Sequence, residues 1–138
     1  MKDLDLAAKH LTTSKHSLVV VRNEQIIATS KSRGVRGILS IYEKNPELLD
    51  QAAVADKIIG RAVAMICELG EVKSCYAPLI SKGAIKVLEQ TQINHRSEKQ
   101  VEAIKNKKGT GLCPIEQLTL EFEDSKKAVK KIKEFFSE

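Results

Sequence analysis

The chain has 138 residues, of which 42% are hydrophobic and 4% aromatic, and its formal net charge is +5. This composition argues against a disordered chain and predicts a single domain over residues 1–138 with an aliphatic core. No apolar run reaches the length of about 20 residues that a membrane span needs, and three cysteines without a CxxC spacing are typical of a reduced, cytoplasmic protein.

The first third of the chain predicts a helix followed by a β-hairpin. Apolar residues recur at helical spacing near the N-terminus, and two β-branched runs are then separated only by Asn23 and Glu24. The elements expected are a helix over 3–11, antiparallel strands over 18–22 and 25–29, and a short helix over 38–43 that ends before Asn45-Pro46.

The segment "VADKIIGRAVAMICELG", residues 54–70, predicts a buried central helix over 58–69 because it is apolar on nearly every side. We expect Asp56 near the N-cap and Gly70 in a left-handed cap at the other end. On this helix Asp56, Gly60, Ala64 and Cys67 would form one stripe, whose small residues favour close packing.

The second half predicts alternating strands and helices. Ser81 is a typical N-cap residue, and Pro114 favours the first position of a short helical turn. The elements expected are a strand over 71–80, a helix from Ser81 to Glu89, a strand over 91–101, a turn over 113–117 and an amphipathic helix over 124–137. This order predicts an α/β domain with a mixed sheet covered by helices.

Asp56 and Lys57 are the first candidates for a functional site. Aspartate is a preferred helix cap, so capping is one interpretation of Asp56 and acid–base catalysis is the other. Lys57 has the charge that a helix N-terminus disfavours, which indicates an anionic ligand or a carboxylate as its partner.

Cys113 and Glu116 form a second candidate in the sequence "GLCPIE". A thiol at the start of a helical turn has a lowered pKa, which would suit a nucleophile, and Glu116 would be the accompanying acid or base. The alternative is a structural cysteine followed by a glutamate in the first helical turn. Cys67 and Cys75 are expected in the core.

Basic residues provide weaker signals. Arg33 and Arg36 in "RGVRG" could contact an anion, although the spacing is not that of a phosphate-binding glycine loop. Two basic stretches, 96–108 and 126–133, are compatible with nucleic-acid binding or with a solvated surface. The three histidines show no metal-binding spacing.

Most of residues 17–116 resembles a small prokaryotic family of unassigned function with a cytidine-deaminase-like fold. The stretches that carry the resemblance are "SLVVVRNEQIIATSKSRGV", "ADKIIGRAVAMI", "CYAPLISKGAIKVLE" and "GLCPIE". The resemblance implies a three-layer α-β-α sandwich with a mixed sheet, in which two helix N-termini meet at one pocket.

Zinc deaminases of this fold carry an HxE or CxE pattern at the first of these helix starts and PCxxC at the second. This sequence has Ala55-Asp56-Lys57 and Ser81-Lys82-Gly83-Ala84 in those places. We therefore expect no metal ligands and no zinc-dependent deamination. The resemblance instead implies a pocket formed by Asp56, Lys57, Ser81 and Lys82, closed by Cys113 and Glu116.

The sequence thus predicts a metal-free, cofactor-free protein that binds or acts on a small anionic or nucleotide-like molecule. In this hypothesis Asp56 is the acid or base, Lys57 its electrostatic partner and Cys113 a nucleophile. The alternative is a non-catalytic module that binds RNA or a protein through its basic surface, with Lys105, Lys107 and Lys108 as the RNA contacts. We expect no membrane partner, and a homodimer is a further hypothesis.

Overall fold

A mixed sheet of six strands forms the centre of the fold in the computed structural model, which describes residues 2–32, 34–106 and 108–137. The strands are β1 (Leu18–Arg22), β2 (Gln25–Ser30), β3 (Ala53–Asp56), β4 (Ile58–Ile59), β5 (Ser74–Ser81) and β6 (Asn94–Val101). Their order is β2-β1-β3-β5-β4, and β6 also pairs with β5. Strand β1 is antiparallel to β2 and β3, whereas β3, β4 and β6 run parallel to β5.

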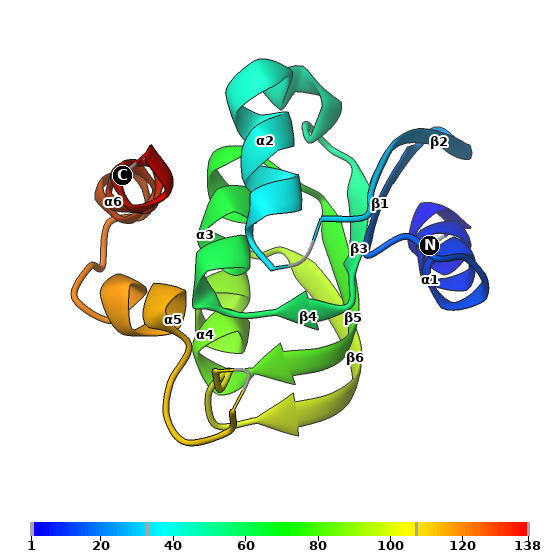
Figure 1. The fold of residues 1–138 in the computed structure, drawn as a ribbon. Coiled ribbons are helices and arrows are strands. Elements are labelled where there is room, and N and C mark those ends of the chain that lie inside the picture. The colour runs from blue at the N-terminus through cyan, green and yellow to red at the C-terminus, as the bar shows by residue number, and fades with distance from the viewer. Residues whose placement is uncertain (1, 33, 107, 138) are drawn as a thin grey trace.

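Helices cover both faces of this sheet (Figure 1). They are α1 (Lys2–Thr13), α2 (Arg36–Lys44), α3 (Arg61–Leu69), α4 (Lys82–Gln90), α5 (Pro114–Thr119) and α6 (Ser125–Ser137), with a 3₁₀ turn, η1 (Pro46–Leu48). Figure 1 shows α1 on one face, α2, α3 and α4 on the other, and α5 and α6 outside α3. The predicted α/β class with a mixed sheet is confirmed. In the described part of the chain, no helix has the length and apolar character needed to cross a membrane.

Local sequence patterns predicted the hairpin and the helix before it. The apolar positions of α1, namely Leu4, Ala7, Ala8 and Leu11, are its buried residues. Asn23 and Glu24 form the turn between β1 and β2 with φ of 53° and 63°, the left-handed values that a two-residue hairpin turn of this kind requires.

The predicted central helix over 58–69 is too long at its N-terminal end. Residues Ala53–Asp56 and Ile58–Ile59 are two pieces of one interrupted strand that runs alongside β5 in constant register, and α3 begins only at Arg61. Pairing on both sides, with β1 and with β5, determines this conformation, because it satisfies the backbone groups of a buried apolar segment. Asp56 therefore ends a strand and caps no helix, and the predicted stripe from Asp56 to Cys67 does not exist.

The C-terminal end of α3 also differs from the prediction. Gly70 has φ of −81° and a right-handed conformation, and the left-handed residue is Glu71, with φ of 59°. Gly70 is instead required for close packing, because a Cβ there would lie 2.8 Å from Leu49 Cδ1.

The core is divided by the sheet. The larger cluster lies on the side of the sheet covered by α2, α3 and α4 and includes the buried residues of α6, and the smaller one lies under α1. Cys67 and Cys75 are fully buried in the larger cluster, as predicted, with their Sγ atoms 3.7 Å apart and no disulfide between them.

Candidate functional site

Helices α3 and α4 begin beside each other. Ile59 of β4 pairs with Ile80 of β5 in parallel, and each strand leads directly into its helix. A Cβ placed on Gly83 would lie 3.8 Å from Arg61 Cβ, so the first turns of the two helices are in contact range. The convergence of two helix N-termini that the sequence implied is present, but residues 60 and 61, not 56 and 57, form the first of them.

Ser81 caps α4, as predicted. Its side chain is fully buried, and its Oγ accepts a hydrogen bond of 3.1 Å from the Ala84 backbone N–H. This bond satisfies one of the backbone donors that a helix leaves unpaired at its N-terminus.

Replacement of Ser81 by alanine is expected to lower the free energy of unfolding by about 1 kcal/mol, because it removes a buried acceptor from the first turn of α4. Urea denaturation followed by circular dichroism measures this change. An unaltered midpoint would contradict a capping role for this hydroxyl.

The first turn of α3 receives a carboxylate from a distant part of the chain. Glu116, in the first turn of α5, is 6% exposed, and its Oε1 accepts a 2.7 Å hydrogen bond from the Arg61 backbone N–H. Burial raises the pKa of Glu116, while this hydrogen bond and the charge of Arg61 act in the opposite direction. The N-terminus of α3, where an anion is favoured, is therefore occupied by the protein's own Glu116 carboxylate.

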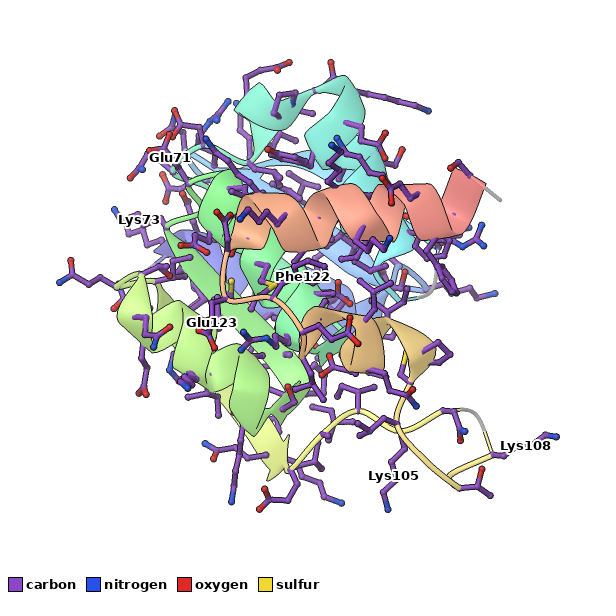
Figure 2. The ribbon with its side chains drawn as sticks, turned by 90° about the vertical axis from the view of Figure 1, so that its left-hand side faces the viewer. Glu71, Lys73, Lys105, Lys108, Phe122 and Glu123 are labelled. Carbon is purple, nitrogen blue, oxygen red and sulfur yellow. The ribbon has the colours of Figure 1, made fainter. Side chains whose placement is uncertain are left out.

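The Arg61 side chain of α3 makes a second connection to α5, this time as the hydrogen-bond donor. It is 8% exposed, its Nε donates to the Thr119 carbonyl oxygen at 3.2 Å, and its Nη2 donates to that of Phe122 at 2.8 Å. Both acceptors belong to the end of α5 and the segment after it, where carbonyl oxygens lack helical partners. Figure 2 shows Phe122 in the connection between α5 and α6.

Asp56 lies in the core and not at a helix start. It is 4% exposed, and its Oδ1 accepts a long hydrogen bond of 3.4 Å from the Ile58 N–H. Burial raises its pKa to about 8, so the carboxyl is largely protonated at neutral pH. The Lys57 side chain is exposed, and its backbone N–H donates to the Ser17 carbonyl oxygen at 3.1 Å.

The remaining predicted residues are dispersed. Cys113 is the half-buried N-cap of α5 without a side-chain capping bond, and Lys82 Nζ pairs with Glu102 Oε1 at 2.6 Å. Arg36 stacks on Phe136 of α6, its Cζ 4.4 Å from the ring centroid, so it is engaged elsewhere in the fold. Arg33 lies outside the described residues.

A hollow of about 790 Å³ lies at the ends of β4, β5 and β6, within the size range of small-molecule pockets. Its described lining residues are mainly apolar or glycine: Ile58, Leu79, Val101, Glu102, Ala103, Ile104, Lys105, Gly109, Thr110, Gly111 and Leu112. Ile104 connects the hollow to the helix starts, because a Cβ on Gly60 would lie 3.0 Å from Ile104 Cγ1. The hollow is therefore adjacent to the predicted site, although none of the predicted site residues is among the lining residues described.

The flap, which we define as residues 102–106 and 108–112, forms one side of this hollow. It folds back on itself through an antiparallel bridge between Lys105 and Leu112, and Asn106 N–H donates to the Gly111 carbonyl oxygen at 2.9 Å. The Cys113 N–H, directly after the flap, donates to the Ile104 carbonyl oxygen at 2.9 Å. Figure 2 shows Lys105 and Lys108 extending from the flap in different directions.

The residues at the two helix starts do not fit the zinc ion of deaminases. Such an ion needs three His or Cys ligands, whereas these starts carry Gly60-Arg61 and Ser81-Lys82, and the Arg61 guanidinium is a buried cation. Within residues 2–32, 34–106 and 108–137 there is no group of three His, Cys, Asp or Glu side chains that could hold a metal.

The mixed sheet, its interrupted strand and the two adjoining helix starts define an α/β domain whose described residues provide no metal-ligand set. A family model, "TM1506: Domain of unknown function (DUF1893)", matches residues 6–136, and the chain belongs to this family. The resemblance of the sequence to a family of unassigned function is thereby confirmed.

Two solved structures are similar in fold. The crystal structure of a DUF1893 family protein (TM1506) from Thermotoga maritima has 24% identity and a TM-score of 0.86, over 94% of this chain and 87% of that chain. RibD, form 2, from Acinetobacter baumannii has 14% identity and a TM-score of 0.49, over 70% of this chain and 33% of that chain. These similarities concern the fold alone. No curated protein matches the chain.

The two basic stretches do not merge into one surface. Lys105 and Lys108 lie on the flap, whereas the lysines of the second stretch lie on α6, and Figure 2 shows α5 between these elements. Lys107 lies outside the described residues. RNA binding and the homodimer stay predictions.

Sequence reasoning missed the role of Arg61 and assigned Gly60 to a helix interior. The available signal was an arginine in the otherwise apolar run "IIGRAVAMI", because a buried guanidinium needs acceptors from elsewhere in the chain. The glycine before it indicated a close approach, and the approaching group is the Glu116 carboxylate.

Proposed function

We propose that this protein binds a small molecule with a flat apolar body, of nucleobase size, in the hollow between the flap and the ends of β4 and β5. The observation that carries the proposal is the hollow itself, which presents Ile58, Leu79 and Ile104 at the strand ends of an α/β sheet. Ligands of open α/β sheets characteristically bind beyond the carboxyl ends of the strands.

Exposure of Ile58 supports this proposal. It is 41% exposed although it belongs to the interrupted strand beside β5, and it lines the hollow together with other apolar residues. A contiguous apolar concavity of this kind gains free energy when a ligand removes it from water.

The roles predicted for Asp56 and Cys113 are separate from this proposal. Asp56 is buried, and neither residue is among the described lining of the hollow. Their catalytic roles stay hypotheses, and the proposal concerns binding.

Replacement of Ile58 by glutamate is expected to weaken binding of phenylnaphthylamine, a neutral aromatic probe, by about tenfold or more, because it places a charge on the apolar wall. Probe fluorescence measured as a titration gives the affinity and the stoichiometry, which we expect to be one site per chain for the unmodified protein.

Ile26→Glu is the matched control. Ile26 is 42% exposed, also lies in a strand, and is not part of the hollow, so this variant should bind the probe like the unmodified protein. Equal losses in the two variants, or no saturable binding by the unmodified protein, would contradict the proposed site. Circular dichroism of both variants verifies that they are folded.

A further inference from the structure

Of the two charged residues that line the hollow, one has an ion-pair partner among the described residues and the other has none. Glu102 and Lys105 are the charged residues in its described lining. The Glu102 carboxylate already has a cation beside it, since its Oε1 lies 2.6 Å from Lys82 Nζ. Lys105 has no carboxylate within 4.0 Å among the described residues.

The backbone holds Lys105 at a defined place on the rim. It pairs with Leu112 across the flap, and hydrogen bonds of its neighbours Ile104 and Asn106 anchor it on both sides. The aliphatic stem of a lysine can cover apolar surface while its ammonium group stays in water. Lys105 can therefore line the hollow and present its charge at the mouth, and Figure 2 shows this side chain directed outward from the flap.

We infer that the natural ligand of the hollow carries one anionic group, a carboxylate, sulfonate or phosphate, on its apolar body, and that this group pairs with Lys105. This inference rests on the proposed function and adds the chemical class of the ligand. An uncharged ligand would leave the Lys105 charge at the rim without a partner, whereas an amphipathic anion matches both the apolar floor and the cation. The net charge of +5 attracts anions to the molecule in general.

A pair of probes that differ by one charged group tests the inference. Phenylnaphthylamine is neutral, and anilinonaphthalenesulfonate has the same ring skeleton with one sulfonate. We expect Lys105→Met to reduce the affinity ratio of the anionic to the neutral probe about fivefold, the size of one charge pair in a solvated setting. Added salt should lower the same ratio more in the unmodified protein than in Lys105→Met.

Lys108→Met is the matched control, because Lys108 is an exposed lysine of the same flap that is not part of the described lining. This variant should keep the ratio of the unmodified protein. A ratio unchanged in Lys105→Met, or lowered equally in both variants, overturns the inference, while neutral-probe binding that still depends on Ile58 leaves the proposed function intact. Loss of neutral-probe binding in the unmodified protein overturns the proposed function itself.

Discussion

Asp56→Asn is expected to stabilise the protein at neutral pH and to stabilise it more as the pH rises. Burial raises the pKa of Asp56 to about 8 from an ordinary value of 3.8, so the folded state holds a proton that the unfolded state releases between these values. Asp56 therefore does not reduce the free energy of unfolding below pH 3.8. Its contribution lowers this free energy progressively as the pH rises from 3.8 to about 8, and the loss is constant above about pH 8. Asparagine resembles the protonated carboxyl and does not titrate.

The measurement is the difference in free energy of unfolding between Asp56→Asn and the unmodified protein at several pH values. The slope is about 1.4 kcal/mol per pH unit, so the difference should grow by about 3 kcal/mol between pH 5 and pH 7.5. Asp50→Asn, at an exposed aspartate, is the control and should show no such trend. A pH-independent difference for Asp56→Asn would show that this carboxyl is solvated or paired in the folded protein.

A protonated Asp56 also limits its chemistry. With a pKa of about 8 it is largely neutral in the folded protein at pH 7, and an acid–base role would require access that its 4% exposure does not provide. A perturbed pKa is common to catalytic residues and to titrating core residues, and the burial of Asp56 favours the second role.

Helices with a clear apolar face were predictable from the sequence, because local spacing alone determines which side is buried. The apolar positions of α1 and of α6 recur at helical intervals, and Ser81 provides a local start signal for α4. The hairpin was predictable for the same reason, since two residues separate its strands.

Strand β3 was not predictable in the same way. A short apolar run buried on both faces has no periodicity that separates strand from helix, and its conformation depends on pairing with β1 and β5. Because β3 was taken for part of the helix, Asp56 was predicted to lie at the start of α3. The helix in fact begins at Arg61.

The contact at the start of α3 was beyond local reasoning for a second reason. Glu116 and Arg61 are 55 residues apart, and no spacing rule connects them. The sequence did indicate a carboxylate near the first turn of α5 and a glycine near α3. Only the fold shows that the Glu116 carboxylate occupies the space that a side chain at Gly60 would need.

Gly60→Ala is expected to lower the free energy of unfolding by about 2–4 kcal/mol, although the substitution adds one methyl group. The Gly60 backbone, with φ of −96° and ψ of −177°, is extended and suits any residue, so the cost is steric. A Cβ there would lie 2.0 Å from Glu116 Oε1, and displacement of this carboxylate breaks its hydrogen bond to the Arg61 N–H. That bond involves a charged acceptor at a helix N-terminus, where its loss is most costly.

A double-mutant cycle identifies the cause. In a Glu116→Ala background the carboxylate is absent, so Gly60→Ala should cost about 1 kcal/mol or less, the remainder coming from Ile104 Cγ1 at 3.0 Å. Gly83→Ala in the first turn of α4 is the matched control: its nearest neighbour would be 3.8 Å away, and alanine there should stabilise by up to about 1 kcal/mol. Equal costs of Gly60→Ala in both backgrounds would mean that Glu116 does not determine the need for glycine. Coupling between the two positions would instead establish that α5 is held on α3 by this carboxylate, with the hollow and its flap directly beside that contact.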